Sequence, residues 1–538
     1  MSNIKADLVL LDGKVITLDK VNSQAKAIAL KDGKIMALGS NSTVKKTIGP
    51  STHVLDLNGL TVLPGLIDSH MHPGSYGVYW IRGVQCGPDV ASIDELLDRI
   101  DKKANASAKG AWLLGYTLDD VNLGRYPTRA ELDSVTPENP LYIMRRDGHI
   151  GIANSLALKI VGIDRNTPDP PHGKIDHDDS GEPTGVLREK AKDLVYLKMP
   201  PYTVDEYKKG LQHVYEELLS YGLTSIHASM VGPTEFHAMQ ELRRADKLAI
   251  RTAVHISGRD EGMVEGLITA GIETPFGDDF LKITAVEWVF DTSTSGRTAA
   301  YYKTYVGEPK NTGILLYDQE DITKRVVAAH NAGLRVGLDG VGDRGIDRAL
   351  DAIEVALKAK PRKDHRHRIE HCCCVTPSIR RRLKDLEVID ASATAFMHDL
   401  GDAYLKNRGK AEMRYMWPHR SLIDEGIPAP GHSDASICNA NPWLAIYSMV
   451  TRKTSSGKVL YAKERITPIE AVRAYTIDGA YAAWEENIKG SIEPGKLADL
   501  TIVDRNPLKI PKEDLKNVTT VITVIGGNIM YNKLQLER

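Results

Sequence analysis

The stretch Thr61-Val-Leu-Pro-Gly-Leu-Ile-Asp-Ser-His-Met-His72 is an apolar strand that ends in His70-x-His72. Residues two apart on an extended strand point to the same face, so both imidazoles lie near one point beyond the carboxyl end. This geometry suits two ligands on one metal ion, although two ordinary surface histidines would give the same short pattern. Active sites form at the carboxyl ends of the strands in a parallel barrel, so the motif predicts both a fold and a site.

Strands and helices alternate through the middle of the chain. Apolar, strand-like runs occur at 223–227, 251–255, 334–338 and 388–390. Segments of helical periodicity separate them, at 204–221, 234–247, 321–332 and 344–359, and a further one follows at 467–484. This order predicts an α/β fold with a parallel sheet, either open or closed into a barrel.

The two ends of the chain differ from the middle. Short alternating runs broken by Asp-Gly and Gly-Ser fill residues 6–57, and the same texture returns in 499–531. We therefore expect the two ends to form one antiparallel β domain together. Residues from about 75 to 220 are less regular and rich in proline, which indicates an insertion on the scaffold.

Composition excludes several classes of function. The 538 residues include 69 Lys and Arg against 71 Asp and Glu, a formal net charge of −2. A chain without a basic field does not capture nucleic acid or an anionic membrane, so we expect neither as a partner. Hydrophobic residues at 42% and charged residues at 26% are typical of a globular protein.

The sequence gives no sign of a targeting or membrane segment. No run approaches the roughly 18 apolar residues of a membrane-spanning helix, and the start of the chain lacks a signal-peptide core. We expect a cytoplasmic protein. The five cysteines are odd in number and three are consecutive, Cys372 to Cys374, which suits reduced thiols better than disulfides.

Further candidate ligands stand at the ends of later strand-like runs. Arg366-His-Arg-Ile-Glu-His371 ends in histidine, and Ala429-Pro-Gly-His-Ser-Asp434 ends in aspartate. Imidazole and carboxylate at successive strand ends are the ligands that a hydrolytic divalent cation requires.

Several motifs together resemble the amidohydrolase superfamily. They are Ala6 to Lys14, Val62 to His72, Arg366 to His371, Gly431-His-Ser-Asp434 and Gly490 to Leu500. Within that superfamily, four more motifs resemble the branch that contains N-substituted formamide deformylase: Asp147 to Leu158, Gly185 to Glu189, Gly296 to Ala299 and Gly340 to Arg344. The resemblance covers nearly the whole chain.

The resemblance implies an α/β architecture with a distorted (β/α)8 TIM barrel and a small β-sandwich built from both chain ends. On this basis we expect residues 1–62 and 486–538 to form the composite sandwich, and 63–485 to form the barrel with its insertion at about 75–220. The resemblance also implies one or two divalent metals at the barrel mouth. Carried over by position, it makes His70, His72 and His371 ligands, and Asp434 both a ligand and the catalytic group that shuttles a proton.

Glu287 departs from the pattern of the branch on the fourth strand. Relatives carry there a lysine, carboxylated in many members, that bridges two metals. Alignment through Asp291 places Glu287 at that position, and its two oxygens make it a metal ligand in our prediction. Lys282 is the alternative, but its use loses the match at Asp291.

Asp339 departs on the fifth strand, where the branch has a metal-binding histidine. Aspartate is shorter but still binds cations, and we count Asp339 among the predicted ligands. The full set of three histidines and three carboxylates suits zinc first, with manganese or iron as alternatives. If Asp339 is too short to reach, one metal ion remains, and we favour one.

Three residues are candidates for substrate binding. His432 replaces the usual glycine before Ser-Asp and is either a substrate contact or a core histidine. His149 lies in the insertion at a position that faces the pocket in relatives, and it is either a substrate contact or a structural histidine of the loop. Trp288 could line an apolar pocket, although large apolar residues are more often simply core.

Our leading hypothesis is a metal-dependent hydrolase that cleaves a carbon-nitrogen bond, in an amide, formamide or cyclic amide of a small organic substrate. The changed ligands leave a metal-assisted lyase, decarboxylase or C–C hydrolase as the alternative, and a metal-free binding relative as a second one. Barrels of this family commonly pair, so the resemblance implies a homodimer.

Overall fold

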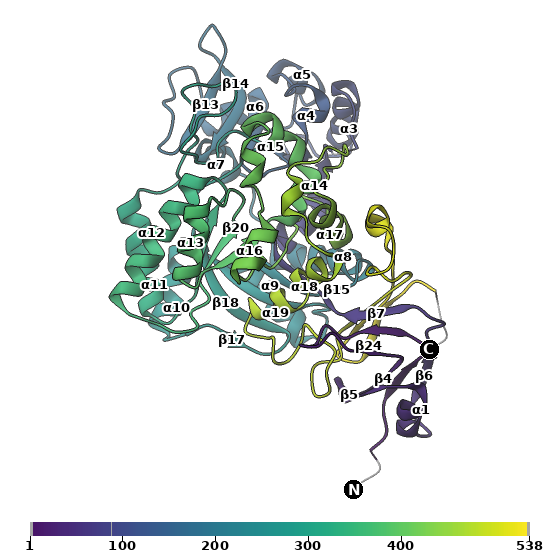
Figure 1. Cartoon of the computed structure of the whole chain (residues 1–538). Helices are drawn as coiled ribbons and strands as arrows, with labels where there is room; N and C mark the ends of the chain where they lie inside the picture. The colour runs from purple at the N-terminus through teal and green to yellow at the C-terminus, as the bar shows by residue number, and fades with distance from the viewer. Residues whose placement is uncertain (1–3, 88, 535–538) are drawn as a thin grey trace.

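Seven parallel strands form the wall of a barrel at the centre of the computed structural model, which describes residues 4–87 and 89–534 (Figure 1). In sheet order they are β8 (Leu66–Met71), β15 (Leu223–Val231), β16 (Arg251–Ser257), β18 (Leu281–Trp288), β19 (Val336–Gly340), β20 (Arg368–His371) and β21 (Ile389–Ser392). Residues 428–434 fill the gap between β21 and β8. Ser392 forms a parallel bridge with Gly431, and the Ser69 backbone N–H donates to the Gly431 carbonyl at 3.2 Å. The predicted α/β barrel is therefore confirmed.

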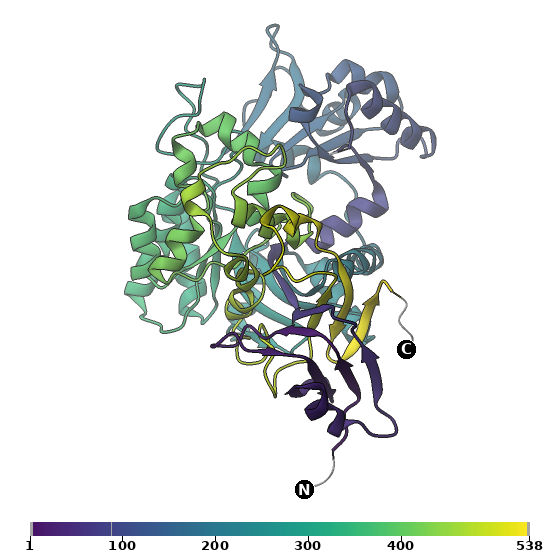
Figure 2. The same ribbon diagram turned by 45° about the vertical axis from the view of Figure 1, so that its right-hand side comes forward.

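Helices cover the outside of the barrel, and α11, α12 and α13 lie side by side along one flank (Figures 1 and 2). Their apolar faces pack on the strands because apolar residues recur at helical spacing. The barrel helices are α8 (Val204–Ser220), α9 (Pro233–Arg244), α10 (Glu261–Thr269), α11 (Gln319–Asn331), α12 (Asp343–Ala359), α13 (Pro377–Asp385), α14 (Thr394–Asp399), α15 (Gly401–Arg408), α16 (His419–Glu425), α17 (Pro442–Thr451), α18 (Pro468–Ala474) and α19 (Ile477–Tyr481). In the described ranges, every helix is too short or too polar to cross a membrane.

Charged side chains occupy part of the barrel interior. On β20, Ile369 belongs to the apolar core, whereas Arg368 and Glu370 are fully buried and reach across to β8. The alternation of a strand explains the opposite directions of Ile369 and its two neighbours. Burial of such groups requires partners, so this interior is a connected polar network.

A separate sheet rises above the barrel at the top of Figure 1. Its strands, in order, are β13 (Gly173–His177), β14 (Pro183–Glu189), β12 (Ile150–Ala153), β11 (Leu141–Arg145), β10 (Leu113–Leu118) and β9 (Gly83–Gln85). The sheet is flanked by α3 (Ile93–Asn105), α4 (Asp120–Leu123), α5 (Arg129–Val135), α6 (Ser155–Val161) and α7 (Lys190–Tyr196).

This sheet spans residues 83–189, a shorter stretch than the insertion of about 75–220 that we expected. The flanking helices α2 (Pro73–Arg82) and α8 pack closely against each other, and α8 also lies on β15. A Cβ atom on Gly77 would lie only 2.3 Å from the carbonyl carbon of Gly210, so glycine at both positions permits this approach.

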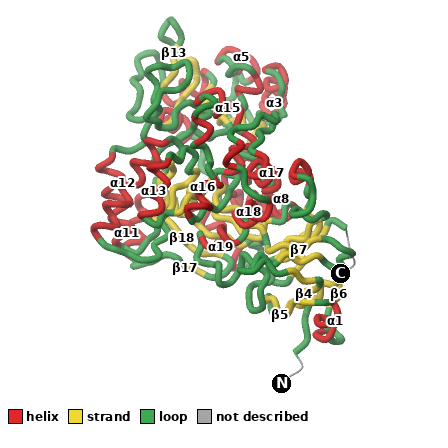
Figure 3. The backbone as a smooth tube through the Cα atoms, viewed as in Figure 1, coloured by secondary structure: helices red, strands yellow, loops and turns green. Residues whose placement is uncertain are grey.

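Both chain ends build two further sheets, whose strands lie at the lower right of Figure 3. One sheet has the order β5 (Lys34–Gly39), β4 (Ala27–Lys31), β1 (Leu8–Leu11), β6 (His53–Asp56). The other has the order β24 (Asn528–Asn532), β23 (Thr520–Ile525), β22 (Leu500–Val503), β7 (Thr61–Pro64), β2 (Lys14–Ile16), β3 (Gln24–Ala25).

These sheets are mixed, so our expectation of a purely antiparallel domain was wrong. The pairs β1–β6 and β2–β7 are parallel, because the chain crosses over through α1 (Asn41–Val44) before it returns to them. A buried ion pair joins this region to the barrel, with Arg251 Nε 2.7 Å from Asp499 Oδ2 and Arg251 Nη2 3.0 Å from Oδ1.

Candidate metal centre

The predicted ligands stand at the carboxyl ends of the barrel strands. His70 is the penultimate residue of β8, and His72 follows it as the residue before α2. Glu287, Asp339 and His371 lie at or near the ends of β18, β19 and β20. Asp434 is the last residue of the segment 428–434 that closes the barrel, and its backbone N–H donates to the His70 carbonyl at 3.0 Å.

His70, His72 and Asp434 converge on one point. The Nε2 atoms of His70 and His72 lie 3.5 Å and 3.1 Å from the same atom, Oδ1 of Asp434. The His70 side chain is fully buried, whereas a quarter of the His72 side chain is exposed. These three residues could hold one metal ion, since each offers a ligand atom close to the other two.

His371 and Asp339 lie beside this group. The His371 ring centroid is 4.7 Å from that of His70, and His371 Nε2 is 3.5 Å from Oδ2 of Asp339. The backbone of His371 has a φ of +65°, in the left-handed region that side chains rarely adopt. This turn brings His371 into the barrel mouth directly after the inward-pointing Glu370, a placement that strand alternation would forbid.

The hydrogen-bond partners of the imidazoles fix which ring nitrogen carries the proton. His70 Nδ1 lies 2.9 Å from Oε2 of Glu370, and His72 Nδ1 lies 3.1 Å from the Ser229 carbonyl oxygen. Carboxylate and carbonyl oxygens only accept, so Nδ1 of each ring donates. The Nε2 atom of each ring is then left to face the Asp434 carboxylate.

Two imidazole nitrogens and an ionised carboxylate that meet at one point favour a positive charge between them, either a proton or a metal ion. In agreement, buried ligand atoms lack hydrogen-bond partners in the described chain: His70 Nε2, Asp434 Oδ1, His371 Nδ1 and Asp339 Oδ1. The donor set of imidazole and carboxylate is one that zinc and similar cations bind. These residues therefore fit a divalent metal ion.

The electrostatics of the site agree with this geometry. Burial opposes protonation of His70, but Glu287, Asp434 and Glu370 outweigh it and raise the pKa of His70 well above its usual value. Burial likewise opposes ionisation of Asp434, but His371, His70 and His72 outweigh it and hold the pKa of Asp434 well below its usual range. The cluster thus attracts positive charge, either a proton or a metal ion.

Glu287 lies below the first group rather than within it. Its Oε2 accepts a hydrogen bond from His255 Nδ1 at 2.8 Å, and its Oε1 has no hydrogen-bond partner in the described chain. Glu287 forms a second cluster of potential ligands with His70 and Glu370. Burial, with the nearby carboxylates of Glu370 and Asp339, raises the pKa of Glu287 well above its usual value, although His70 opposes this.

The three predicted substrate-binding residues lie in different surroundings. His432 is fully buried with its ring 4.8 Å from that of His70, and its Nε2 lies 3.2 Å from the Ala391 carbonyl oxygen. Trp288 is 2% exposed at the end of β18, next to Gly258. His149 lies on the turn after β11, where its Nδ1 is 3.0 Å from Oε2 of Glu189.

The turn that carries His149 lies against loops at the barrel mouth. A Cβ atom on Gly148 would lie 3.6 Å from Ile437, three residues beyond Asp434. Arg145, just before the turn, donates to Ser295 at 3.1 Å, in the loop that follows β18. The insertion therefore caps the end of the barrel where the predicted ligands meet.

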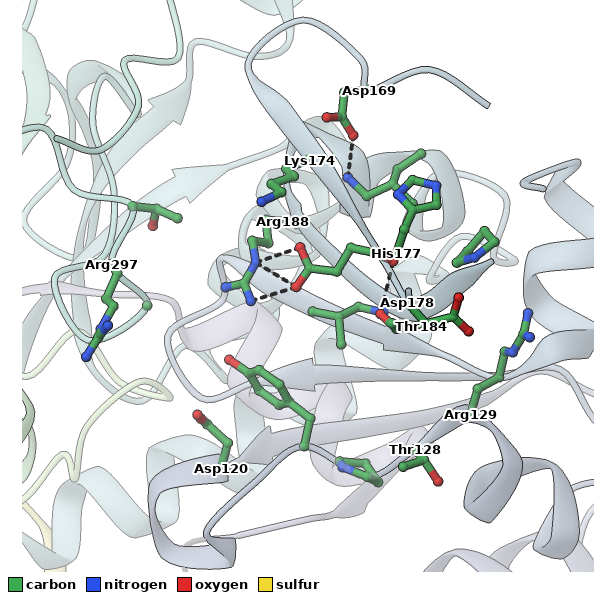
Figure 4. Close-up of a pocket in the computed structure, with 18 of the residues that line it drawn as sticks. Asp120, Thr128, Arg129, Asp169, Lys174, His177, Asp178, Thr184, Arg188 and Arg297 are labelled. Atoms are coloured by element: carbon green, nitrogen blue, oxygen red, sulfur yellow. Dashed lines mark hydrogen bonds and ion pairs between the residues drawn. The ribbon is translucent and has the colours of Figure 1, made fainter. Parts of the chain in front are cut away.

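A cleft of about 1300 Å³ lies between the β13–β14 hairpin and the barrel loop at residues 295–311 (Figure 4). Charged groups in its lining pair with each other, as Arg188 does with Asp176 at 2.7 Å. Its described lining contains none of the predicted site residues. This cleft and the cluster around His70 are therefore separate features.

Residues 53–531 match the model of the amidohydrolase family. The chain belongs to this family. It is 29% identical to N-substituted formamide deformylase from Arthrobacter pascens, over 98% of both chains, and 29% identical to the protein LONG AFTER FAR-RED 3 from Arabidopsis thaliana, over 98% of this chain and 92% of the relative. The family assignment identifies the chain as a hydrolytic enzyme.

Solved structures agree with the family. A metal-dependent hydrolase from Pyrococcus horikoshii OT3 has a TM-score of 0.76 and 25% identity, and the match covers 94% of this chain and 99% of that one. The zinc complex of atrazine chlorohydrolase TrzN from Arthrobacter aurescens TC1 shares the fold, with a TM-score of 0.55, 15% identity and coverage of 98% and 95%.

Sequence reasoning assigned no role to Glu370 and Arg368. Glu370 is hydrogen-bonded to His70, and Arg368 donates a hydrogen bond to Glu370 through Nη2 at 2.7 Å and forms an ion-pair contact through Nε at 2.5 Å. The available signal was that Arg368 and Glu370 are two residues apart, and so on one face, of a strand that ends at the predicted ligand His371. His227 also belongs to this buried polar group, with its Nδ1 3.1 Å from Arg368 Nη1.

Proposed function

We propose that this protein is a metal-dependent hydrolase that cleaves a carbon-nitrogen bond in an amide, formamide or cyclic amide of a small organic substrate. The observation that carries the proposal is the convergence of His70 Nε2, His72 Nε2 and Asp434 Oδ1, with Nδ1 of both rings already hydrogen-bonded elsewhere. The similarity to a deformylase that acts on N-substituted formamides supports the choice of bond.

His70, His72 and Asp434 would hold the metal ion, with His371 beside them and with Asp339 and Glu287 as further oxygen ligands. Zinc fits this mixture of imidazole and carboxylate, and manganese or iron would also be accepted. When bound, a divalent cation lowers the pKa of a water molecule toward neutrality and polarises a carbonyl group.

A single ion is the better fit. A second cation between His70, Glu287 and Glu370 would stand against the Arg368 guanidinium, which already forms an ion pair with Glu370. Like charges at such distances in a buried site repel strongly. We infer that Glu370 and Arg368 orient the ligands around His70 and do not bind a second ion.

Asp434 is the group that moves the proton. Its carboxylate stays ionised because His371, His70 and His72 outweigh its burial and hold its pKa well below the usual range. An ionised carboxylate at the barrel mouth accepts a proton from water and delivers it to the leaving nitrogen, which is general base and then general acid catalysis. His432 stays neutral, because burial and the nearby His70 and His371 lower its pKa well below the usual value.

Metal analysis and product analysis test this proposal together. The purified protein should contain about one equivalent of divalent metal, and a panel of N-substituted formamides and cyclic amides should yield free amine or the ring-opened acid. The variants H70A and D434A should lose the activity. A metal-free protein of full activity, or variants as active as the parent, would contradict the proposal.

A metal-assisted lyase or decarboxylase remains the second candidate. The carboxylate of Asp339, 3.5 Å from His371 Nε2, favours it, because extra negative charge at the site changes which intermediate is stabilised. Including oxo-acids and lactones in the panel separates the two. Amine release from an amide at useful rates would remove the lyase.

A further inference from the structure

We propose that Glu370, anchored by Arg368, is a positioning residue that fixes the tautomer and orientation of His70 and thereby sets the metal affinity of the site. This inference rests on the proposed metal centre. It concerns a carboxylate without solvent contact, since the side chains of Glu370, Arg368 and His70 are all fully buried.

Glu370 is hydrogen-bonded directly to His70. Oε2 of Glu370 lies 2.9 Å from His70 Nδ1, on the opposite side of the ring from Asp434. As long as Glu370 is a carboxylate, it only accepts, so the proton stays on Nδ1 and the Nε2 lone pair points to the metal position.

Arg368 holds Glu370 in place. Arg368 reaches both oxygens of Glu370, with Nε 2.5 Å from Oε1 and Nη2 2.7 Å from Oε2. The same guanidinium donates to the Ser69 carbonyl at 2.8 Å and lies 3.1 Å from His227 Nδ1. Arg368 therefore ties the sixth strand of the barrel to the first and second, and Glu370 cannot rotate away from His70.

Glutamine cannot replace Glu370. Oε2 of the carboxylate accepts hydrogen bonds from both His70 and Arg368, and Oε1 lies in ion-pair contact with Arg368 Nε, whereas an amide offers one oxygen and two N–H donors. In E370Q the amide nitrogen must face either Arg368 or the Nδ1–H of His70, and in both cases donor meets donor. The variant keeps the size of the side chain and loses its acceptor pattern.

The effect of E370Q on the site can be measured as a change in zinc affinity. Mutation of groups that hold metal-binding histidines weakens metal binding by about 10-fold to 100-fold, and we expect E370Q to fall in this range. The measurement is competition for Zn²⁺ between the purified protein and a chromophoric chelator. Zinc affinity of E370Q within twofold of the parent would overturn the proposal.

D499N is the matched control. Asp499 forms the same kind of buried, two-point ion pair with Arg251, both side chains being 3% exposed, and the structure gives it no bond to a histidine. D499N should lose folding stability as E370Q does, yet keep the zinc affinity of the parent. An equal loss of zinc affinity in both variants would reduce Glu370 to a structural role.

A measurement on the unmodified chain covers the case in which E370Q does not fold. In zinc-loaded protein with ¹⁵N-labelled histidine, the His70 signal, assigned by its absence from H70N, should show a proton on Nδ1 and none on Nε2. A proton on Nε2 would overturn the proposal. If the parent takes up no zinc at all, the proposed function fails; if the parent binds zinc and E370Q binds it equally, only the role of Glu370 fails.

Discussion

Acid should destabilise the protein through a chain of three buried histidines beneath β19 and β20. His367 Nε2 lies 2.8 Å from His330 Nδ1, and His330 Nε2 lies 2.7 Å from the Lys360 carbonyl oxygen. His365 Nδ1 accepts from the His367 backbone N–H at 3.0 Å, while its Nε2 lies 3.0 Å from the Leu386 carbonyl oxygen.

Every ring nitrogen of these three histidines has a hydrogen-bond partner, and this hydrogen-bond pattern holds only when the rings are neutral. The Val336 backbone N–H donates to His367 Nδ1 at 3.1 Å, so His367 Nε2 carries the proton and donates to His330. A second proton on any ring would bring a donor against a donor.

His365 gives a magnitude for this effect. Burial lowers its pKa to about 4, although the bond to Leu386 opposes the shift. In the unfolded chain the value is about 6.5, so below that pH the unfolded state binds more protons and stability falls until the folded pKa is passed. Between pH 7.5 and pH 5 the loss from this group is about 2 kcal/mol.

Urea unfolding of the parent and H365N, followed by tryptophan fluorescence with a chelator present, tests this value. The variant cannot titrate at this position, so its stability deficit at pH 7.5 should shrink by about 2 kcal/mol at pH 5. The control H237N alters a surface histidine on α9, 56% exposed, and its difference from the parent should stay constant. A deficit of H365N that is the same at both pH values would refute the reasoning.

Three further outcomes follow from the structure. D434N should lower kcat by about 10²-fold to 10⁴-fold with unchanged circular dichroism, because the proton-transfer group is lost; activity within fivefold of the parent would speak against this role. G258A should lower the free energy of unfolding by about 1–3 kcal/mol, because its Cβ would lie 2.3 Å from Nε1 of the buried Trp288. The control G266A on α10 has no atom within 4 Å of its added Cβ and should be neutral or stabilising. Equal effects of the two substitutions would contradict the packing argument. D499N should cost about 3–5 kcal/mol, because it leaves the Arg251 guanidinium buried without its carboxylate, and thermal unfolding no different from the parent would show that the pair is dispensable.

The barrel and the cluster of His70, His72 and Asp434 could be predicted because their sequence signals are local. A strand that ends in His-x-His places His70 and His72 by alternation alone, and regular spacing of strands and helices predicts a parallel sheet. Asp434 could be predicted from the motif Gly431-His-Ser-Asp434. The structure places these three residues together.

The roles of Glu370 and Arg368 could not be predicted. They depend on contacts across the barrel and on a break in the inward–outward alternation of side chains along β20. Glu370 and His371 are consecutive yet both point inward, which the positive φ of His371, +65°, makes possible. Glu370 meets His70 across a separation of 300 residues. No pattern on a single strand reports either fact.

The limits of the insertion have no local signal in the sequence, for a related reason. Helices α2 and α8 have the same local periodicity whether they belong to the barrel or to an insertion. Only the contact between Gly77 and Gly210, and the packing of α8 on β15, assigns them to the barrel. Likewise, parallel pairing of β1 with β6 arises from a crossover that short alternating runs do not reveal.

Anomalous diffraction from crystals soaked in zinc tests the central claim most directly. The account predicts one strong peak within bonding distance of His70 Nε2, His72 Nε2 and a carboxylate oxygen of Asp434, with Glu370 still bonded to His70 Nδ1 on the far side of the ring. Well-ordered crystals in which these imidazoles turn away from one another and zinc binds elsewhere would contradict it.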